Sequence, residues 1–498
     1  MTKNKFYITT AILYTNSKPH LGFAFELIQA DVLARYHRLK GEEVYFLTGT
    51  DEHGITVSRA AEKLDKTPLE LADEVAIQAQ DLTQQLNISN DDFIRTSDKS
   101  RHWPTVIKFW NQLKENGDLY KKEYEGLYCV GHEAFIKKSE LVDGLCPLHK
   151  TEPEKVKEEN WFFKLTKYKK EIKRAIEEGE LNIVPNSRAN EIINLIKDAE
   201  DVSFSRPVSS LKWGIPVPDD PNQTMYVWAD ALTNYISALG WGQAGQNFEK
   251  FWPADVHIVG KDILRFHAII WPAMLLSVGL ELPKSIYVHG FLNVNGQKMS
   301  KTTGNVVDPF SIIEKFGPEV LRYYLLREIS STEDGDFSEE KLIARYNGDL
   351  ANGLGNLISR IITLVDKNLN AELIYKEELL DADVALKISE VVARCDTAID
   401  SFKLHEALAA IWELIGFSDK YMNDRKPWAA DTSPEEFLKT MTNLVMMLHH
   451  IARMLLPFMP ETADKIMHIL GVEPGIDPTE NYKFLVKKSA GLFPRLEQ

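Results

Sequence analysis

The chain is poor in cysteine and has no long apolar run. Only 3 of its 498 residues are cysteine, which excludes a small fold held together by disulfide bonds. No apolar stretch is long enough to span a bilayer. The opening MTKNKFYITTAILYTN enters a strand-like run without a charged leader or a cleavage site. We therefore expect a cytoplasmic protein that does not associate with membranes.

Basic residues are outnumbered, and the commonest phosphate-binding motif is missing. With 58 Lys and Arg against 73 Asp and Glu, the net charge is −15. This net charge counts against a polyanionic partner, although the total would not reveal a local basic groove. The chain also lacks the pattern Gly-x-x-x-x-Gly-Lys-Ser/Thr. Any nucleotide must therefore bind through other loops.

What the chain does contain is a 44 % hydrophobic fraction, enough for a large core divided among two to four domains. Near the N-terminus, FYITTAIL is typical of a strand, AFELIQADVLARYHRLKG has helical spacing with a glycine stop, and EEVYFLTGTDEHG predicts a second buried strand. Strand, helix and strand in this order indicate an α/β fold with a parallel sheet.

The pattern changes along the chain and divides it into five parts. Residues 1–118 form the first half of the α/β domain. Residues 119–222 hold two of the three cysteines and several mixed-charge segments, and we interpret them as an insertion. Residues 223–290 return to strand–helix alternation, and 291–345 form a linker region. Residues 346–498 are almost wholly helical, which predicts an all-α bundle.

Two loops are candidates for phosphate binding. In KPHLGFAFE, His20 can donate to a phosphoryl oxygen, and Gly22 opens a helix whose N-terminus favours an anion. In NGQKMSKTTGN, Lys298 and Lys301 flank a Met-Ser pair between glycines. Taken singly, the first could be an ordinary turn with a surface histidine, and the second a solvated basic turn.

In this order, the two loops resemble the His-Ile-Gly-His and Lys-Met-Ser-Lys-Ser signatures of the class I aminoacyl-tRNA synthetases. The chain is most similar to the methionyl-tRNA synthetase family, over essentially its whole length. The motifs that carry this resemblance are AILYTNSKPHLG, GTDEHG, YVWADALTNY, GKDILRFH, HGFLNVNGQKMSK and GPEVLRYYLL. Two positions depart from the family pattern: Phe23 replaces the usual second histidine, and Thr302 replaces the final serine.

The resemblance implies a Rossmann-type, doubly wound parallel sheet with an inserted connective domain and a helical anticodon-binding domain. It implies ATP-dependent activation of L-methionine to methionyl-adenylate, with Mg²⁺ accompanying ATP, and transfer of methionine to the 3′ end of tRNA(Met). The substrate carboxylate is already a nucleophile, so the main requirement is positive charge around the phosphates. Lys298 and Lys301 would hold the leaving phosphates, and His20 the reacting region.

Further site residues are implied by the same resemblance. ATP would also be held by Gly22, Phe23, Glu26, Gly260 and Asp262. Asp51 would pair with the methionine ammonium, and the rest of the methionine pocket would be Ile12, Tyr14, Trp228, Ala231, Leu232, Tyr235, Ile263 and His267. The alternatives are that Glu26 is a solvated helix position, that Asp262 and Asp51 are caps, and that the aromatic residues are simply core.

The insertion contains two pairs of candidate metal ligands, Cys129-x-x-His132 and Cys146-x-x-His149. This spacing predicts a structural Zn²⁺ site. The alternative is a knuckle that has lost its metal, with Cys129 packed as a small apolar side chain. The third cysteine, Cys395, is expected in the core. The insertion also looks too short for the editing domain of the leucyl, isoleucyl and valyl enzymes.

In the helical part, Asn356 and Arg360 lie one turn apart and could bind unstacked anticodon bases, with Trp428 as a stacking platform. Trp428 could instead pack into the bundle. The chain ends soon after the bundle, from which we expect a monomer. Two other functions stay open: a class I synthetase for cysteine or leucine, and an inactive RNA-binding or regulatory paralogue, which the Phe23 substitution would fit.

Overall fold

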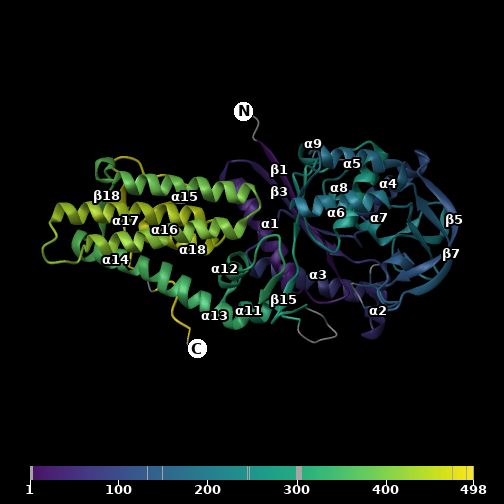
Figure 1. Cartoon of the computed structure of the whole chain (residues 1–498), viewed down its shortest axis with the longest axis horizontal. Coiled ribbons are helices and arrows are strands. Elements are labelled where there is room, and N and C mark those ends of the chain that lie inside the picture. The colour runs from purple at the N-terminus through teal and green to yellow at the C-terminus, as the bar shows by residue number, and fades with distance from the viewer. Residues whose placement is uncertain are drawn as a thin grey trace. The chain divides into compact units, whose positions relative to one another are not determined.

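The structure is a computed structural model that describes residues 4–131, 133–147, 150–243, 245, 247–298, 306–473, 475–488 and 491–496. The chain divides into two compact units (Figure 1). The first comprises Met1–Ala30 and Glu42–His289, and the second Asp31–Gly41 and Gly290–Gln498. Within the described residues, no helix combines the length and the apolar character needed to cross a membrane.

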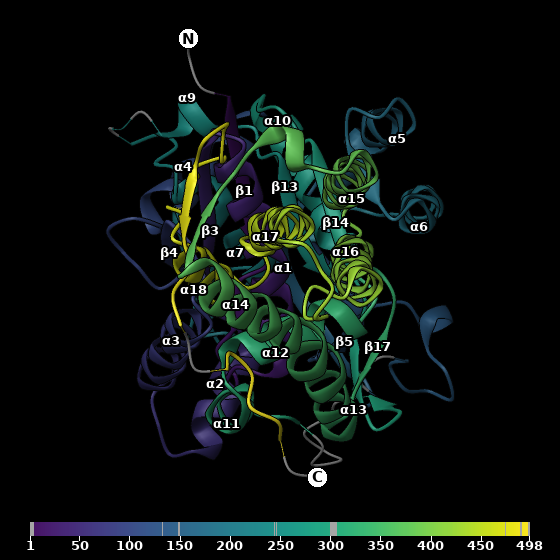
Figure 2. The same cartoon turned by 90° about the vertical axis from the view of Figure 1, so that its left-hand side faces the viewer.

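A parallel sheet forms the centre of the first unit, as the sequence predicts. In the described part of the chain it has seven strands in the order β2-β3-β1-β13-β14-β8, with β4 also paired to β3, and every pairing is parallel. Figure 2 shows β1, β3, β13 and β14 side by side. The bounds are β1 Lys5–Thr10, β2 Leu13–Tyr14, β3 Glu43–Asp51, β4 Asp92–Arg95, β8 Asn182–Val184, β13 Val256–Gly260 and β14 Ser285–His289.

The central strands are buried on both faces, since every residue of β13 and nearly every residue of β1 and β14 is buried. Helices cover such a sheet on both sides, which is typical of Rossmann-type folds. The helices of this unit are α1 (Leu21–Leu39, whose last part belongs to the second unit), α2 (Ile55–Lys63), α3 (Pro68–Gln85), α4 (Trp103–Glu115), α5 (Lys169–Glu177), α6 (Asn186–Lys197), α7 (Val227–Ala231), α8 (Asn234–Ser237), α9 (Asn247–Phe251), the π-helix η3 (Phe266–Ile270) and α10 (Trp271–Val278).

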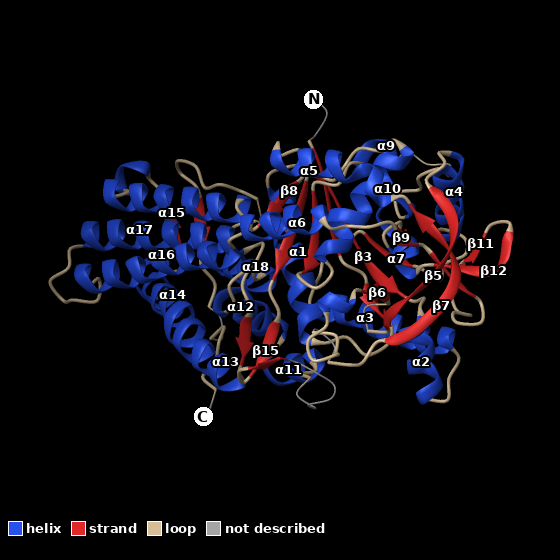
Figure 3. Cartoon of the chain, turned by 45° about the vertical axis from the view of Figure 1, so that its right-hand side comes forward, coloured by secondary structure: helices blue, strands red, loops and turns tan. Residues whose placement is uncertain are grey.

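The predicted insertion contains two antiparallel sheets of its own. β5 (Leu119–Cys129) and β7 (Glu154–Phe163) pair over ten residues and form the long curved ribbon visible in Figure 3. They are joined by β6 (Ala134–Ile136) and β9 (Val202–Ser203), while β10 (Ser205–Pro207), β12 (Asp220–Met225) and β11 (Pro216–Val217) make the second sheet.

One segment within residues 119–222 differs from the expected layout. β8, flanked by α5 and α6, pairs in parallel with β14 and so extends the sheet of the α/β domain. The two flanking helices α5 and α6 are rich in charged residues and bury only a narrow stripe of apolar side chains. In α5 this stripe is Ile172, Ala175 and Ile176. This charge made the segment look like part of the insertion, although its fold is that of the surrounding domain.

The second unit begins with a small sheet next to the lysine loop. β15 (Leu292–Val294) pairs with β16 (Gln297–Lys298) in a hairpin and with β17 (Gly335–Phe337) in parallel. Asn295 and Gly296 connect the hairpin with φ values of 50° and 75°. Positive φ at both turn residues is what a tight two-residue hairpin turn requires, and Asn-Gly is its preferred sequence.

Helices make up most of the second unit, which confirms the predicted bundle. Figure 1 shows the C-terminal helices running alongside one another. Their bounds are α11 (Pro309–Phe316), α12 (Pro318–Glu328), α13 (Glu339–Arg345), the π-helix η4 (Tyr346–Gly355), α14 (Asn356–Leu369), α15 (Ala382–Asp400), α16 (Leu404–Arg425), α17 (Pro434–Leu455) and α18 (Pro460–Leu470), with a two-stranded sheet of β18 (Glu372–Ile374) and β19 (Lys483–Leu485). η4 leads directly into α14.

Candidate active site and nucleic-acid interface

A small cavity of about 50 Å³ lies at the carboxyl ends of β1 and β3, beside α7, α8 and η3. In α/β sheets, ligands bind at this edge. All nine residues expected in the methionine pocket line this one cavity, together with Ala11 and Asn234: Ile12, Tyr14, Asp51, Trp228, Ala231, Leu232, Tyr235, Ile263 and His267. They come from four separate stretches of sequence, and only the fold brings them together.

Asp51 supplies the cavity with a buried carboxylate. Its side chain is 2 % exposed, and its Oδ1 has no hydrogen-bond partner in the described part of the chain. Burial, and then the neighbouring carboxylates of Asp230 and Glu133, raise the pKa of Asp51 well above its usual range. A cationic group entering the cavity would reverse this effect. The site therefore fits a primary ammonium group beside an apolar side chain.

Aromatic rings form the apolar wall. Trp228 stacks on Phe266 with an angle of 7° between the ring planes, and Tyr14 meets Trp228 edge-on with ring centres 6.2 Å apart. The Tyr235 hydroxyl donates to His267 Nε2 at 2.7 Å, and His267 Nδ1–H donates to the Ile263 carbonyl at 3.0 Å. These bonds fix the tautomer and orientation of the ring, and burial keeps the imidazole neutral. An uncharged wall of this kind suits a thioether, which interacts favourably with aromatic rings.

The neutral state of His267 predicts acid sensitivity. Burial lowers its pKa to about 4, against about 6.5 in the unfolded chain. The unfolded chain therefore binds a proton first, so this residue's contribution to stability is complete above pH 6.5 and is lost as the pH falls toward 4. We expect the free energy of unfolding to drop by on the order of 3 kcal/mol over this range. Urea titrations of the wild type and of H267Q measure it, and an unchanged pH dependence in H267Q would contradict this assignment.

The predicted nucleotide residues lie at the same edge of the sheet. His20 precedes α1, and its Nδ1 accepts from the Phe23 N–H at 3.3 Å, so a neutral ring carries its proton on Nε2. Phe23 itself is 5 % exposed and packs into the core. Gly22 lies in the first turn of α1. This geometry leaves the imidazole at a helix N-terminus, as an anion site requires.

Glu26 is buried in the first unit, at 6 % exposure. It is not a solvated helix position, because its side chain is buried between two strand ends. Oε1 accepts from the Ala11 N–H at 2.6 Å, and Oε2 lies 2.9 Å from His289 Nε2. Burial raises its pKa, and His289 partly offsets this. Its contacts tie the end of β1 to the end of β14.

Gly260 is the last residue of β13, and Asp262 follows it by two residues. Asp262 is exposed, and a Cβ added to Gly260 would come within 2.7 Å of its Oδ1 and 3.8 Å of the His289 ring. A side chain at position 260 would therefore displace the Asp262 carboxylate. The lysines cannot be placed in the same way: Lys298 ends β16, but its side chain and the whole of Lys301 lie outside the described residues.

The candidate metal ligands are described in part. Cys129 and Cys146 are 1 % and 0 % exposed and share one apolar cluster with Ile136. His132 and His149 lie outside the described residues. Among the residues that are described, no group of three or more His, Cys, Asp and Glu side chains could hold a metal ion. Cys395 is buried in α15, as expected for a core residue.

Two of the three candidate anticodon residues meet directly. The Arg360 guanidinium lies 5.3 Å from the centre of the Trp428 ring and donates to Asp419 at 2.6 Å and to Asn423 at 2.7 Å. Trp428 is 52 % exposed, so it is not a core residue of the bundle. Asn356 is also exposed, one turn before Arg360 on α14. The three form an accessible polar and aromatic surface.

Comparison with known proteins agrees with this arrangement. The family model described as tRNA synthetases class I (M) matches residues 6–155 and 136–362, and the model of the anticodon-binding domain of tRNA ligase matches residues 381–490. A methionine–tRNA ligase from Thermotoga maritima is 44 % identical over 97 % of this chain and 78 % of its own length. One from Rhizobium meliloti is 43 % identical over 98 % of this chain and 94 % of its own. The chain belongs to the methionyl-tRNA synthetase family.

Solved structures of this family superpose closely. The Mycobacterium tuberculosis methionyl-tRNA synthetase in complex with methionyl-adenylate has a TM-score of 0.94 at 38 % identity, covering 99 % of this chain and 100 % of that one. Its apo form has a TM-score of 0.87 at 35 % identity, covering 100 % and 99 %. Both the α/β fold and the helical domain of a methionyl-tRNA synthetase are therefore shown for this chain.

The structure adds residues to this site that the sequence did not indicate. Asp230 on α7 is 1 % exposed and lies 2.6 Å from His53 Nδ1 and 2.7 Å from His102 Nε2. Burial acts to raise the pKa of Asp230, but the two histidines outweigh it and hold the pKa below its usual range. His53 follows Asp51 by two residues, and Trp228 precedes Asp230 by two. This buried network therefore joins the candidate ammonium site to the aromatic wall.

The aromatic wall can be tested by removing Trp228. W228A deletes the ring between Tyr14 and Phe266. Each lost sulfur–aromatic contact is worth about 0.3–1.5 kcal/mol and each misfit methylene about 1–3 kcal/mol. We expect the methionine KM to rise on the order of 10-fold or more in pyrophosphate exchange, with a nearly unchanged circular dichroism spectrum. A global loss of fold would instead make Trp228 a core residue.

Proposed function

We propose that the chain activates L-methionine with ATP to form methionyl-adenylate and transfers the methionyl group to the 3′ end of tRNA(Met). The observation that carries this proposal is the cavity itself. Nine residues chosen from the sequence for a methionine pocket line it, and its one acidic group has an unpaired buried oxygen. The family membership of the chain supports the same reaction.

In the first step, the methionine carboxylate attacks the α-phosphorus of ATP and pyrophosphate leaves. Asp51 would hold the ammonium and the aromatic wall the thioether, so that the carboxylate faces the strand ends of β1 and β13. His20 would donate from Nε2 to the phosphate. Lys298 and Lys301 would neutralise the departing pyrophosphate. Mg²⁺ would accompany ATP, and Asp262 would bind the ribose hydroxyls.

For tRNA, we propose that Asn356, Arg360 and Trp428 bind the anticodon. Asp419 and Asn423 fix the guanidinium of Arg360 over the exposed Trp428 ring. A fixed, exposed aromatic ring can stack on an unpaired base, and an amide can read its edge. The match of the anticodon-binding family model to this domain supports the proposal.

Charging of a methionine tRNA transcript by the purified chain tests the function. We expect methionine-dependent pyrophosphate exchange and formation of methionyl-tRNA, despite Phe23. Exchange with cysteine or leucine instead would identify a different class I synthetase. No exchange with any amino acid, combined with tRNA binding, would favour an inactive RNA-binding paralogue.

We also propose that the insertion holds one Zn²⁺ through Cys129, His132, Cys146 and His149. The two buried thiols in one cluster support this, because a tetrahedral structural site needs its ligands gathered in this way. Atomic absorption on protein purified without an affinity tag should find about one equivalent of zinc per chain. Less than about a tenth of an equivalent would dismiss the site. We further propose a cytoplasmic monomer, which light scattering after size exclusion tests for its oligomeric state.

A further inference from the structure

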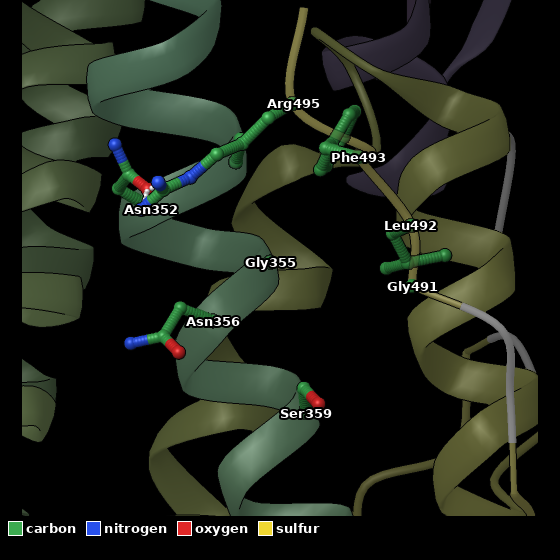
Figure 4. A pocket seen from close by; sticks show the side chains of 9 residues that line it. Asn352, Gly355, Asn356, Ser359, Gly491, Leu492, Phe493 and Arg495 are labelled. Carbon is green, nitrogen blue, oxygen red and sulfur yellow. Dashed lines mark hydrogen bonds between the residues drawn. The ribbon is translucent and has the colours of Figure 1, made fainter.

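A second, larger cavity lies within the helical unit. It is a groove of about 440 Å³ between the η4–α14 helix and the C-terminal segment 491–495 (Figure 4). One wall carries the polar side chains of Asn352, Asn356 and Ser359 from the helix, and the other carries Leu492, Phe493 and Arg495 from the segment. The segment follows residue 490, where the match to the anticodon-binding family model ends.

The segment is tied to the helix mainly through its backbone. The Tyr346 hydroxyl donates to the Pro494 carbonyl at 2.8 Å. The Asn347 side-chain amide donates to the Leu496 carbonyl at 3.2 Å and accepts from the Leu496 N–H at 3.0 Å. The side chains of Phe493 and Arg495 take no part in these bonds and line the groove, where the Phe493 ring also meets the Tyr346 ring edge-on with ring centres 6.1 Å apart.

The groove offers three kinds of contact. Arg495 is exposed and donates to Asn352 Oδ1 at 2.9 Å from Nε, which sets the direction of a guanidinium with further donors. Phe493 presents an aromatic ring on the wall formed by the segment, and a Cβ added to Gly355 would come within 3.6 Å of this ring. The side chains of Asn356 and Ser359 make no hydrogen bond to any other described residue, and both are exposed.

These contacts match one unstacked nucleotide. A guanidinium binds phosphate, an aromatic ring stacks on a base, and amide and hydroxyl groups reach a base edge. The groove is also continuous with the proposed anticodon surface, because Asn356 lines it and lies one helical turn from Arg360.

We propose that this groove binds one nucleotide of the single-stranded anticodon loop, adjacent to the base that meets Trp428. Phe493 stacks on its base, Arg495 binds its phosphate, and Asn356 is shared between the two neighbouring nucleotides. The C-terminal segment thereby completes the tRNA site. This proposal rests on the proposed function, since it requires the helical unit to bind an anticodon.

The test compares F493L and R495Q with matched controls. F493L keeps an apolar side chain but removes the flat ring, and R495Q keeps a polar side chain but removes the charge. K488Q removes a cation from the same C-terminal region, where Lys488 pairs with Asp366 outside the groove. Y346F removes one tether of the segment and no groove side chain. W428A tests the anticodon surface itself.

We expect F493L and R495Q each to raise the KM for a tRNA(Met) transcript on the order of 10-fold. Methionine-dependent pyrophosphate exchange and the melting temperature should stay at wild-type values. R495Q should also reduce the slope of log affinity against log salt by about 1. K488Q and Y346F should leave the tRNA KM within about twofold of the wild type.

Several results would overturn the proposal. An unchanged tRNA KM in both groove variants would exclude nucleotide binding there. An equal rise in K488Q would indicate general electrostatic attraction, and an equal rise in Y346F would make the segment a structural strap. If W428A raises the tRNA KM and the groove variants do not, nucleotide binding in the groove is wrong while the proposed anticodon surface stands. If W428A has no effect either, the proposed anticodon function fails.

Discussion

D51N should lower kcat/KM for methionine in pyrophosphate exchange by on the order of 10²–10³, because it removes the charge that we propose pairs with the substrate ammonium. Truncating one member of a buried charge pair costs about 2–5 kcal/mol. Asp51 is 2 % exposed, so water cannot replace the lost carboxylate. The ammonium is bound in both the ground state and the transition state, and we therefore expect most of the loss in KM.

A substrate analogue sharpens this prediction. The wild type should reject the methionine analogue that lacks the amino group, whereas D51N should bind methionine and the analogue with similar, weak affinity. Asp65 provides a matched control, because it is exposed with φ 55°, a conformation that asparagine also adopts readily. D65N should behave as the wild type. Full discrimination by D51N would show that the ammonium binds elsewhere.

The second large effect is expected from the lysine loop. K298A and K301A should each lower kcat for methionine activation by on the order of 10²–10³, corresponding to about 3–4 kcal/mol for one donor to a developing charge. Negative charge grows on the pyrophosphate only as the reaction proceeds. The methionine KM should therefore change little, since in the proposed mechanism the lysines act in the transition state.

Lys315 is a suitable control for these variants. It is an exposed lysine of α11, close in sequence to the loop, and it pairs with Glu339. K315A should leave kcat within about twofold of the wild type. If the K298A/K301A double variant retained more than a third of wild-type kcat, the assignment of the loop to the leaving group would be wrong. Presteady-state adenylate formation separates this step from product release.

The sequence was sufficient to predict the parallel sheet, the helical bundle and the residues of the aromatic cavity. Strand and helix periodicity carries the first two. The cavity could be predicted because its residues occur in short motifs shared with a family, and not because any one of them signals a ligand. Trp228 alone cannot be distinguished from a core tryptophan, as its stacking on Phe266 shows.

Other parts of the site depend on contacts between residues far apart in sequence. Asp230 meets His102 across 128 positions, and Glu26 meets His289 across 263. A carboxylate in a helical stretch looks the same in sequence whether it is solvated or buried with partners. The sequence also did not reveal that β8 belongs to the central sheet, because the charged helices on either side of it resemble the mixed-charge composition of the insertion. Such pairings become visible only when the topology is known.

The π-helical segment η4 has a consequence for how the helical domain can vary. Each residue of a regular helix advances the chain by about 100° around its axis, and a π-turn accommodates one residue more. Losing a single residue between Tyr346 and Gly355 would let the segment tighten to regular winding. Because the wide turn takes up the extra residue, Asn356 and Arg360 would then keep nearly the same direction relative to Trp428. A change of one residue in chain length is therefore tolerated in this segment, whereas the same change within the regular helix α14 would turn its exposed face by about 100°.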